Sequence, residues 1–113
     1  SILNRLDADP YDGILIRFKG DGKRYQLRLR QGDRMDGVAY FRHFETKIGE
    51  WEEVFLPFDS FQASYRGRRL PDYPKLDTSR ISQLGLMISD KQEGNFRLEV
   101  QRIALYFNEH FQT

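Results

Sequence analysis

The sequence has 113 residues, a length typical of one domain. Its 18 basic and 17 acidic side chains give a formal net charge of +1, whereas a dedicated nucleic-acid binder usually carries a strong basic excess. The absence of cysteine excludes a disulfide scaffold, a thiolate zinc site and a cysteine nucleophile. No run approaches the roughly 18 apolar residues of a membrane helix, so we expect no direct membrane insertion.

Alternation of apolar and polar residues at the start of the chain predicts two strands, over 13–19 and 25–30. The turn Gly20-Asp21-Gly22 between them predicts a β-hairpin with an apolar inner face. Its outer face would carry Arg17, Arg28 and Arg30 as one basic patch. These arginines could meet an anionic partner, or they could simply keep an exposed strand face soluble and unpaired.

The same alternation predicts further strands over Val38–Glu45, Trp51–Leu56, Leu84–Ser89 and Phe96–Phe107. In the last of these, the apolar positions change from even to odd numbers, which predicts a β-bulge near Gln101-Arg102. Asp77-Thr78-Ser79 could cap one helical turn that drops Ile81 into the core. The predicted core further contains Trp51, Phe58, Phe61, Leu84, Leu86, Ile88, Phe96 and Leu98.

Short strands separated by turns favour an all-β fold, a mostly antiparallel β-sandwich or jelly roll that forms a single domain over residues 1–113. The segment 62–75 is interpreted as an irregular loop, and it contains the string Tyr65-Arg66-Gly67-Arg68-Arg69. Long loops are often functional, and Tyr and Arg are favoured anchors of protein interfaces. Alternatively, Tyr65 packs down while the arginines pair with Asp72, Asp77 or Asp90.

Candidate chemistry is sparse in this sequence. His43 and His110 have no partner at the spacing of metal ligands, and the acidic segment 7–12 lacks the glycine and terminal glutamate of a calcium-binding helix–loop–helix. No carboxylate lies in an apolar stretch that would raise its pKa, and the serines lack a plausible histidine base. We therefore expect no metal, no cofactor and no enzymatic activity.

A longer pattern carries a family resemblance. It comprises Gly49-Glu50-Trp51, Leu56-Pro57-Phe58, Phe61, Arg66-Gly67-Arg68, the block from Leu84 through Gly94, and Leu98-Glu99-Val100. Over about Tyr11 to Ile103 the sequence resembles the complex I intermediate-associated protein family, of the thirty-kilodalton assembly-factor type. The resemblance implies a galactose-binding-domain-like jelly roll without catalytic residues. It also implies a chaperone-like role in assembling the respiratory NADH dehydrogenase.

Domains of that family normally carry further strands before this point. The resemblance therefore predicts an unpaired sheet edge and an exposed apolar face, through which a homodimer could form. It also implies an intracellular location, which is the cytoplasm in a bacterium and the mitochondrial matrix in a eukaryote.

The leading hypothesis is a protein–protein interaction domain with two contact patches: Tyr65, Arg66, Arg68 and Arg69 in the first, and Asp90, Lys91 and Gln92 in the second. The alternative is a carbohydrate-binding module that uses Tyr40, Tyr65 and Tyr73 as exposed platforms. The interpretation of Trp51 as a core residue counts against that alternative.

Overall fold

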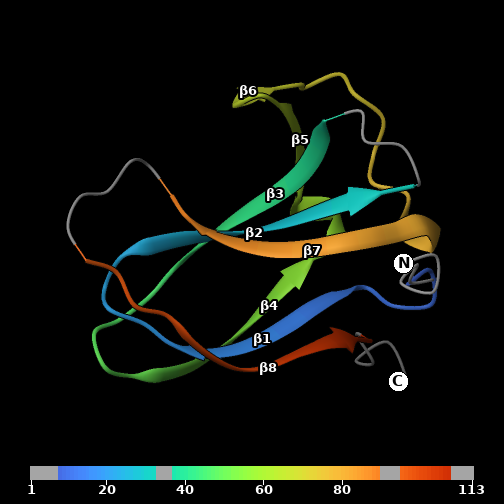
Figure 1. Cartoon of the computed structure of the whole chain (residues 1–113). Coiled ribbons are helices and arrows are strands. Elements are labelled where there is room, and N and C mark those ends of the chain that lie inside the picture. The colour runs from blue at the N-terminus through green and yellow to red at the C-terminus, as the bar shows by residue number, and fades with distance from the viewer. Residues whose placement is uncertain (1–7, 33–36, 90–94, 108–113) are drawn as a thin grey trace.

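The computed structural model describes residues 8–32, 37–89 and 95–107. They form two antiparallel sheets that face each other, and the prediction of an all-β sandwich is therefore confirmed (Figure 1). The strands are β1 (Gly13–Lys19), β2 (Arg24–Gln31), β3 (Val38–Glu45), β4 (Trp51–Pro57), β5 (Gln62–Tyr65), β6 (Arg68–Arg69), β7 (Ile81–Ile88) and β8 (Glu99–Tyr106). Two 3-10 turns, η2 (Phe58–Ser60) and η3 (Thr78–Arg80), follow β4 and precede β7.

The first two strands do not form a hairpin, so that prediction is wrong. The three-stranded sheet has the order β4-β1-β8, whereas β2 lies in the five-stranded sheet of order β6-β5-β3-β2-β7. Each strand has one apolar face, and placing the strands in opposite sheets buries those two faces against each other. Arg17 therefore lies on the outside of one sheet while Arg28 and Arg30 lie on the outside of the other, and the predicted single patch does not exist.

The core lies between the two inner faces. Phe18 from β1 packs against Phe44 from β3 with 5.0 Å between ring centroids, and Tyr25 stacks on Phe44 at 6.2 Å. Each buried aromatic ring removes roughly 150–250 Å² from water, so these rings supply much of the burial. Phe58 and Phe61 are buried, as predicted. The remaining buried members of this cluster are Ala8, Ile14, Ile16, Leu27, Leu29, Tyr40, Leu56, Ala63 and Ile81.

Two local predictions are confirmed. The register between β1 and β8 shifts where Arg17 pairs with Arg102 and Phe18 pairs with Val100, which leaves Gln101 as the extra residue of a bulge. The carboxylate of Asp77 accepts a hydrogen bond of 3.0 Å from the Ser79 N–H and so caps η3. Ile81 follows this turn and is 4% exposed.

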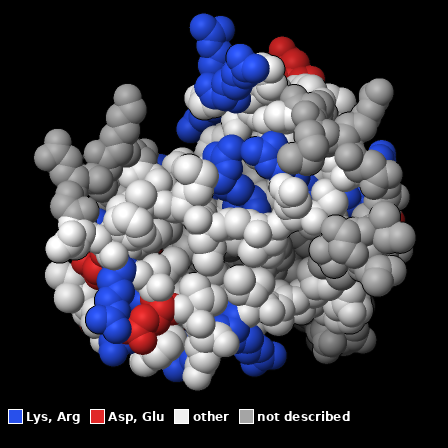
Figure 2. All heavy atoms as spheres, in the orientation of Figure 1, with Lys and Arg blue, Asp and Glu red and all other residues white. Residues whose placement is uncertain are grey.

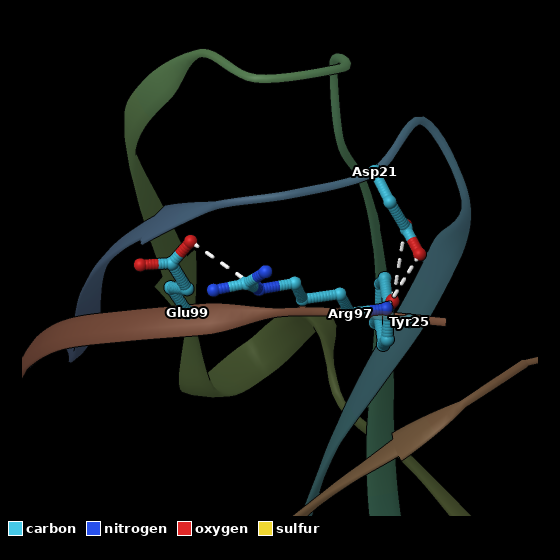
Figure 3. Close-up of polar contacts among 4 residues, drawn as sticks. All are labelled: Asp21, Tyr25, Arg97 and Glu99. Atoms are coloured by element: carbon cyan, nitrogen blue, oxygen red, sulfur yellow. Dashed lines mark hydrogen bonds and ion pairs between the residues drawn. The ribbon is translucent and has the colours of Figure 1, made fainter. Parts of the chain in front are cut away.

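One end of the sandwich is held by Asp21, in the loop that crosses from β1 to β2 (Figure 3). Its carboxylate accepts hydrogen bonds from the Tyr25 hydroxyl at 3.0 Å, from the Arg97 N–H at 2.7 Å and from the Lys23 N–H at 3.2 Å. Burial raises the pKa of Asp21, but these hydrogen bonds outweigh it and hold the pKa below its usual value. Burial and the bond to Asp21 raise the pKa of Tyr25 to about 12.

The opposite side of the sandwich, between β7 and β8, is less well covered. Leu84 is 44% exposed and Phe96 is 60% exposed, so both predictions of core residues are wrong. Leu86, Ile88 and Leu98 are half-buried and pack against the core from its margin. Within the described residues, β7 and β8 each pair with one strand only, so side chains near these edges have a neighbouring strand on one side alone.

Candidate protein-binding surfaces

The arginine-rich segment forms a hairpin and not the irregular loop that we expected. Tyr65 pairs with Arg68 across β5 and β6, and Arg66-Gly67 makes the connection. Both residues of this turn have positive φ, 50° and 81°, the combination that a type I′ turn requires. The Arg66 guanidinium lies over the Tyr65 ring, 5.2 Å from its centroid. The hairpin Tyr65–Arg69 therefore presents its side chains from a defined backbone at the top of Figure 1.

The side chains of this hairpin point largely into solvent. Arg66, Arg68 and Arg69 are exposed, and within the described residues none of them forms an ion pair with Asp72 or Asp77. Tyr65 is 37% exposed, because part of its ring lies against the backbone of Gly37. The other predicted patch (Asp90, Lys91 and Gln92) lies outside the described residues, as does the proposed pairing with Asp90.

A second basic surface lies on the outer face of the five-stranded sheet. Arg28 is paired in register with Gly85 of β7, and Arg30 with Gln83. Because Gly85 has no side chain, a slot opens beside Arg28, and a Cβ added to this glycine would meet nothing within 4 Å. We call this hollow of about 360 Å³ the arginine slot; its lining is Arg28, Arg30, Gln83, Leu84, Gly85, Leu86 and Met87. The expectation that Gly85 allows close packing is wrong.

A chain of polar contacts fixes the position of Arg28. Its Nη1 donates a hydrogen bond of 2.7 Å to Oε1 of Gln26, and Nε2 of Gln26 donates one of 3.4 Å to the Ser89 hydroxyl. The same hydroxyl lies 2.9 Å from Nδ1 of His43. Ser89 thus has the histidine neighbour that we did not expect, but its side chain is 0% exposed and out of reach of a substrate.

The electrostatics of the arginine slot favour an anionic ligand. Burial, and then repulsion from Arg30, lower the pKa of Arg28. Within the described residues no carboxylate forms an ion pair with Arg28 or Arg30. A carboxylate bound in the slot would relieve the repulsion and could accept two parallel hydrogen bonds from a guanidinium.

An uncharged surface separates the two sheets along their open side. Figure 2 shows it as a broad white region, with Lys and Arg side chains on the side of the five-stranded sheet above it. We call this surface the apolar seam; it consists of Leu84, Leu86 and Ile88 near β7, and of Phe96, Leu98, Val100, Ile103 and Leu105 in and before β8. Two hollows of about 200 and 380 Å³ lie along it. Alternation showed that these residues face inward, but it could not show that they lie at sheet edges.

The outside of the three-stranded sheet carries a different arrangement. Trp51 is 43% exposed, so its assignment to the core is wrong. The Arg17 guanidinium lies over its indole ring at 5.4 Å from the centroid, and the Lys19 ammonium lies at 6.0 Å. Nε of Arg17 also donates a hydrogen bond of 2.6 Å to Oε1 of Gln101. Arg17 is thus engaged with its own sheet, on the face opposite the arginine slot.

Metal and membrane sites were searched for in the described part of the chain. There, no three His, Cys, Asp or Glu side chains lie close enough together to hold a metal ion. Asp9 of the acidic segment accepts a hydrogen bond of 2.6 Å from the Thr78 hydroxyl. No helix in these residues has the length and hydropathy needed to span a membrane.

The fold and its surfaces define a β-sandwich with a projecting basic hairpin, a basic slot and an uncovered apolar seam, a combination typical of protein-recognition domains. Sequence comparison gives the particular family. The model of the family described as complex I intermediate-associated protein 30 matches residues 2–100, and the chain belongs to this family.

Individual relatives carry the same description. The mouse protein named "Complex I intermediate-associated protein 30, mitochondrial" is 29% identical over 88% of this chain and 32% of its own length. A *Caenorhabditis elegans* protein with the prefix "Probable" is 27% identical over 85% of this chain and 29% of its own length. An uncharacterized *Schizosaccharomyces pombe* protein is 37% identical over 75% of this chain and 44% of its own length. The chain thus spans about a third of the length of the first two of these relatives.

Proposed function

We propose that this chain is a non-catalytic, chaperone-like protein-binding part of an assembly factor for respiratory complex I. Membership of the complex I intermediate-associated protein 30 family supports the proposal, as do the names of the mouse and nematode relatives. Those relatives are named mitochondrial, which supports the mitochondrial matrix as the location in a eukaryote; in a bacterium we propose the cytoplasm. The partner is a complex I subunit or an assembly intermediate.

The observation that carries this proposal is the hairpin Tyr65–Arg69. Three arginines and one tyrosine share a short hairpin, and the arginines form no ion pair within the described residues. Both residue types are frequent anchors of protein interfaces. The type I′ turn holds them before binding, which lowers the conformational entropy that association would otherwise cost. The surface is therefore preorganised to contact another protein.

Carbohydrate binding has less support. Of the three tyrosines considered as sugar platforms, Tyr40 is 2% exposed and donates its hydroxyl to the Pro74 carbonyl at 2.8 Å. Tyr65 and Tyr73 are 37% and 40% exposed, and the uncovered indole of Trp51 is a further aromatic surface that we had assigned to the core. Titration of the Trp51 fluorescence with common glycans tests this alternative, and an unchanged spectrum would count against it.

The test of the proposed function is a double substitution, Arg66→Ala with Arg68→Ala. The immobilised chain is incubated with detergent-solubilised respiratory membranes, and the bound complex I subunits are quantified by mass spectrometry. We expect the double variant to recover about tenfold less of these subunits, since truncating interface anchors typically costs about 1–2 kcal/mol each. Both side chains are exposed, so we expect the melting temperature to stay unchanged.

The matched control is Lys47→Ala with Arg102→Ala, which removes the same charge from two other exposed positions. Equal recovery by both double variants would show that overall charge, and not the hairpin, governs capture. A fall in the melting temperature of the hairpin variant alone would show that Arg66 and Arg68 are structural. If the unmodified chain recovers no complex I subunit, the proposed function is wrong.

A further inference from the structure

The strand β7 separates the arginine slot from the apolar seam. Leu84 and Leu86 line hollows on its inner side, and Gly85 lines the slot on its outer side. Both surfaces end at the same free edge, because β7 pairs only with β2 within the described residues. Anything that lies along this edge contacts both surfaces at once.

The edge of β7 has little of the protection that exposed edge strands usually have. Natural edges are commonly blocked by charged side chains, prolines or bulges. Ile81–Ile88 contains no charged residue and no proline, and its one register shift lies at the start of the strand, where Gln31 pairs with Ile81. Its central residue, Gly85, also lets another backbone approach closely. These features favour pairing with another extended chain.

We propose that the free edge of β7 binds an extended segment of a protein partner as an added strand, in which apolar and acidic side chains alternate. This inference rests on the proposed function, since it describes how such a partner is held. The apolar side chains enter the seam between β7 and β8, and the acidic ones point outward to Arg28 and Arg30. Main-chain hydrogen bonds provide affinity, and the alternating side chains provide specificity.

The spacing of strands is compatible with this arrangement. Neighbouring strands lie about 4.8 Å apart, so the added strand runs roughly 10 Å from β2, which carries Arg28. The long side chain of Arg28 can span this distance only if nothing stands between, and Gly85 leaves that path open. On the inner side, the added strand covers Leu84 and also Val100 and Ile103, which are 39% and 38% exposed.

Charge complementarity selects the partner. Within the described residues, Arg28 and Arg30 form no ion pair with a carboxylate, and the nearby β7 provides none. A second copy of this chain that paired through its own β7 would bring no acidic side chain to the slot, because that strand contains no Asp or Glu. An acidic segment of another protein meets the requirement, and a homodimer does not.

The test measures binding of a fluorescein-labelled peptide of alternating valine and glutamate by fluorescence polarisation. One control peptide carries lysine at each glutamate position, and the other has the same composition with the valines and glutamates in separate blocks. We expect the Lys peptide to bind at least about tenfold more weakly, because like charges at an interface cost several kcal/mol. The block peptide loses affinity because its side chains no longer alternate between the two faces.

Protein variants locate the site. Gly85→Leu places a side chain in the path of Arg28 without a steric clash, so the variant should fold yet bind the Val/Glu peptide about tenfold more weakly. Arg28→Gln with Arg30→Gln should weaken binding by a similar factor and reduce its salt dependence. The matched control, Arg17→Gln, changes an arginine on the opposite face and should leave the affinity unchanged. Hydrogen exchange should show slower exchange of the β7 amides when the peptide is bound.

Three results would overturn the proposal: equal affinity for the Val/Glu and Lys peptides, unchanged binding by the Gly85 and double-arginine variants, or concentration-dependent dimers that protect the β7 amides without peptide. The last result would assign the edge to a second copy of this chain. The peptide assay contains no complex I subunit, and the hairpin variants leave β7 intact. A failure of the edge site is therefore distinguishable from a failure of the proposed function.

Discussion

The two sides of this sandwich are built from the same kind of alternating sequence but differ in how well they are closed. At the crossover from β1 to β2, Asp21 accepts three hydrogen bonds and the rings of Phe18 and Phe44 are in contact. Along β7 and β8, Leu84 and Val100 point inward as well, yet they remain about two-fifths exposed. An inward direction therefore does not guarantee burial, which also depends on a neighbouring strand at the sheet edge.

The largest expected effect lies in the closed part of the core. Phe18→Ala removes a ring that is 0% exposed and in contact with Phe44, and we expect it to lower the free energy of unfolding by about 3–5 kcal/mol. Chemical denaturation followed by circular dichroism measures this change. A loss below about 1 kcal/mol would mean that the core around Phe18 is loosely packed, and it would remove the difference between the two sides.

The hydrogen bonds at the crossover should give the next largest effect. Asp21→Asn removes the negative charge that accepts bonds from Tyr25, Lys23 and Arg97, and we expect a loss of about 1–3 kcal/mol at neutral pH. Because the folded-state pKa of Asp21 is lowered, its contribution is present above the ordinary pKa of about 4 and is lost as the pH falls through the lowered pKa.

The measurement compares denaturation curves at neutral pH and near pH 2, where Asp21 is largely protonated in both the folded and unfolded states. The wild-type chain and the Asp21→Asn variant should differ at neutral pH and converge in acid. A constant difference across this range would show that the charge of Asp21 does not act in the folded state, and that the crossover is held by other contacts.

Local features of this fold could be predicted from the sequence because they depend on neighbouring residues. The bounds of β1 and β3 follow from strict alternation, and the bulge at Gln101 follows from the change of phase between Val100 and Ile103. The cap at Asp77 depends on the Ser79 N–H two positions away. In each case, the interaction or the pattern that sets the structure lies within a short stretch of chain.

Predictions failed where the partner lies far away in sequence. The pairing of β1 with β4 and β8, and not with β2, depends on strands that a local pattern cannot order, and with it the placement of Arg17 away from Arg28. Trp51 was expected in the core, but its position in β4 lies on the outward face, in register with Lys19. The hairpin at Arg66-Gly67 had a local signal, a glycine at a turn position, which we overlooked among the surrounding arginines and prolines.

The sites divide in the same way. The exposed position of Arg66, Arg68 and Arg69 could be predicted from their charge. The arginine slot could not, because it needs the register that places Gly85 beside Arg28. The chain of contacts from His43 through Ser89 to Gln26 joins three segments that only the five-stranded sheet brings together.

The smallest expected effect belongs to the open edge. Leu84→Ala truncates an apolar side chain that is already 44% exposed, so we expect a loss below about 1 kcal/mol in the isolated chain. If an added strand covers the seam, the same substitution should weaken binding of the Val/Glu peptide more than it lowers stability, since Leu84 becomes buried only in the complex. A loss in the isolated chain as large as that of Phe18→Ala would show that the seam is already covered in solution. Repeating the denaturation at several protein concentrations would then decide whether a second copy covers it, because the stability of a dimer rises with concentration and that of a monomer does not.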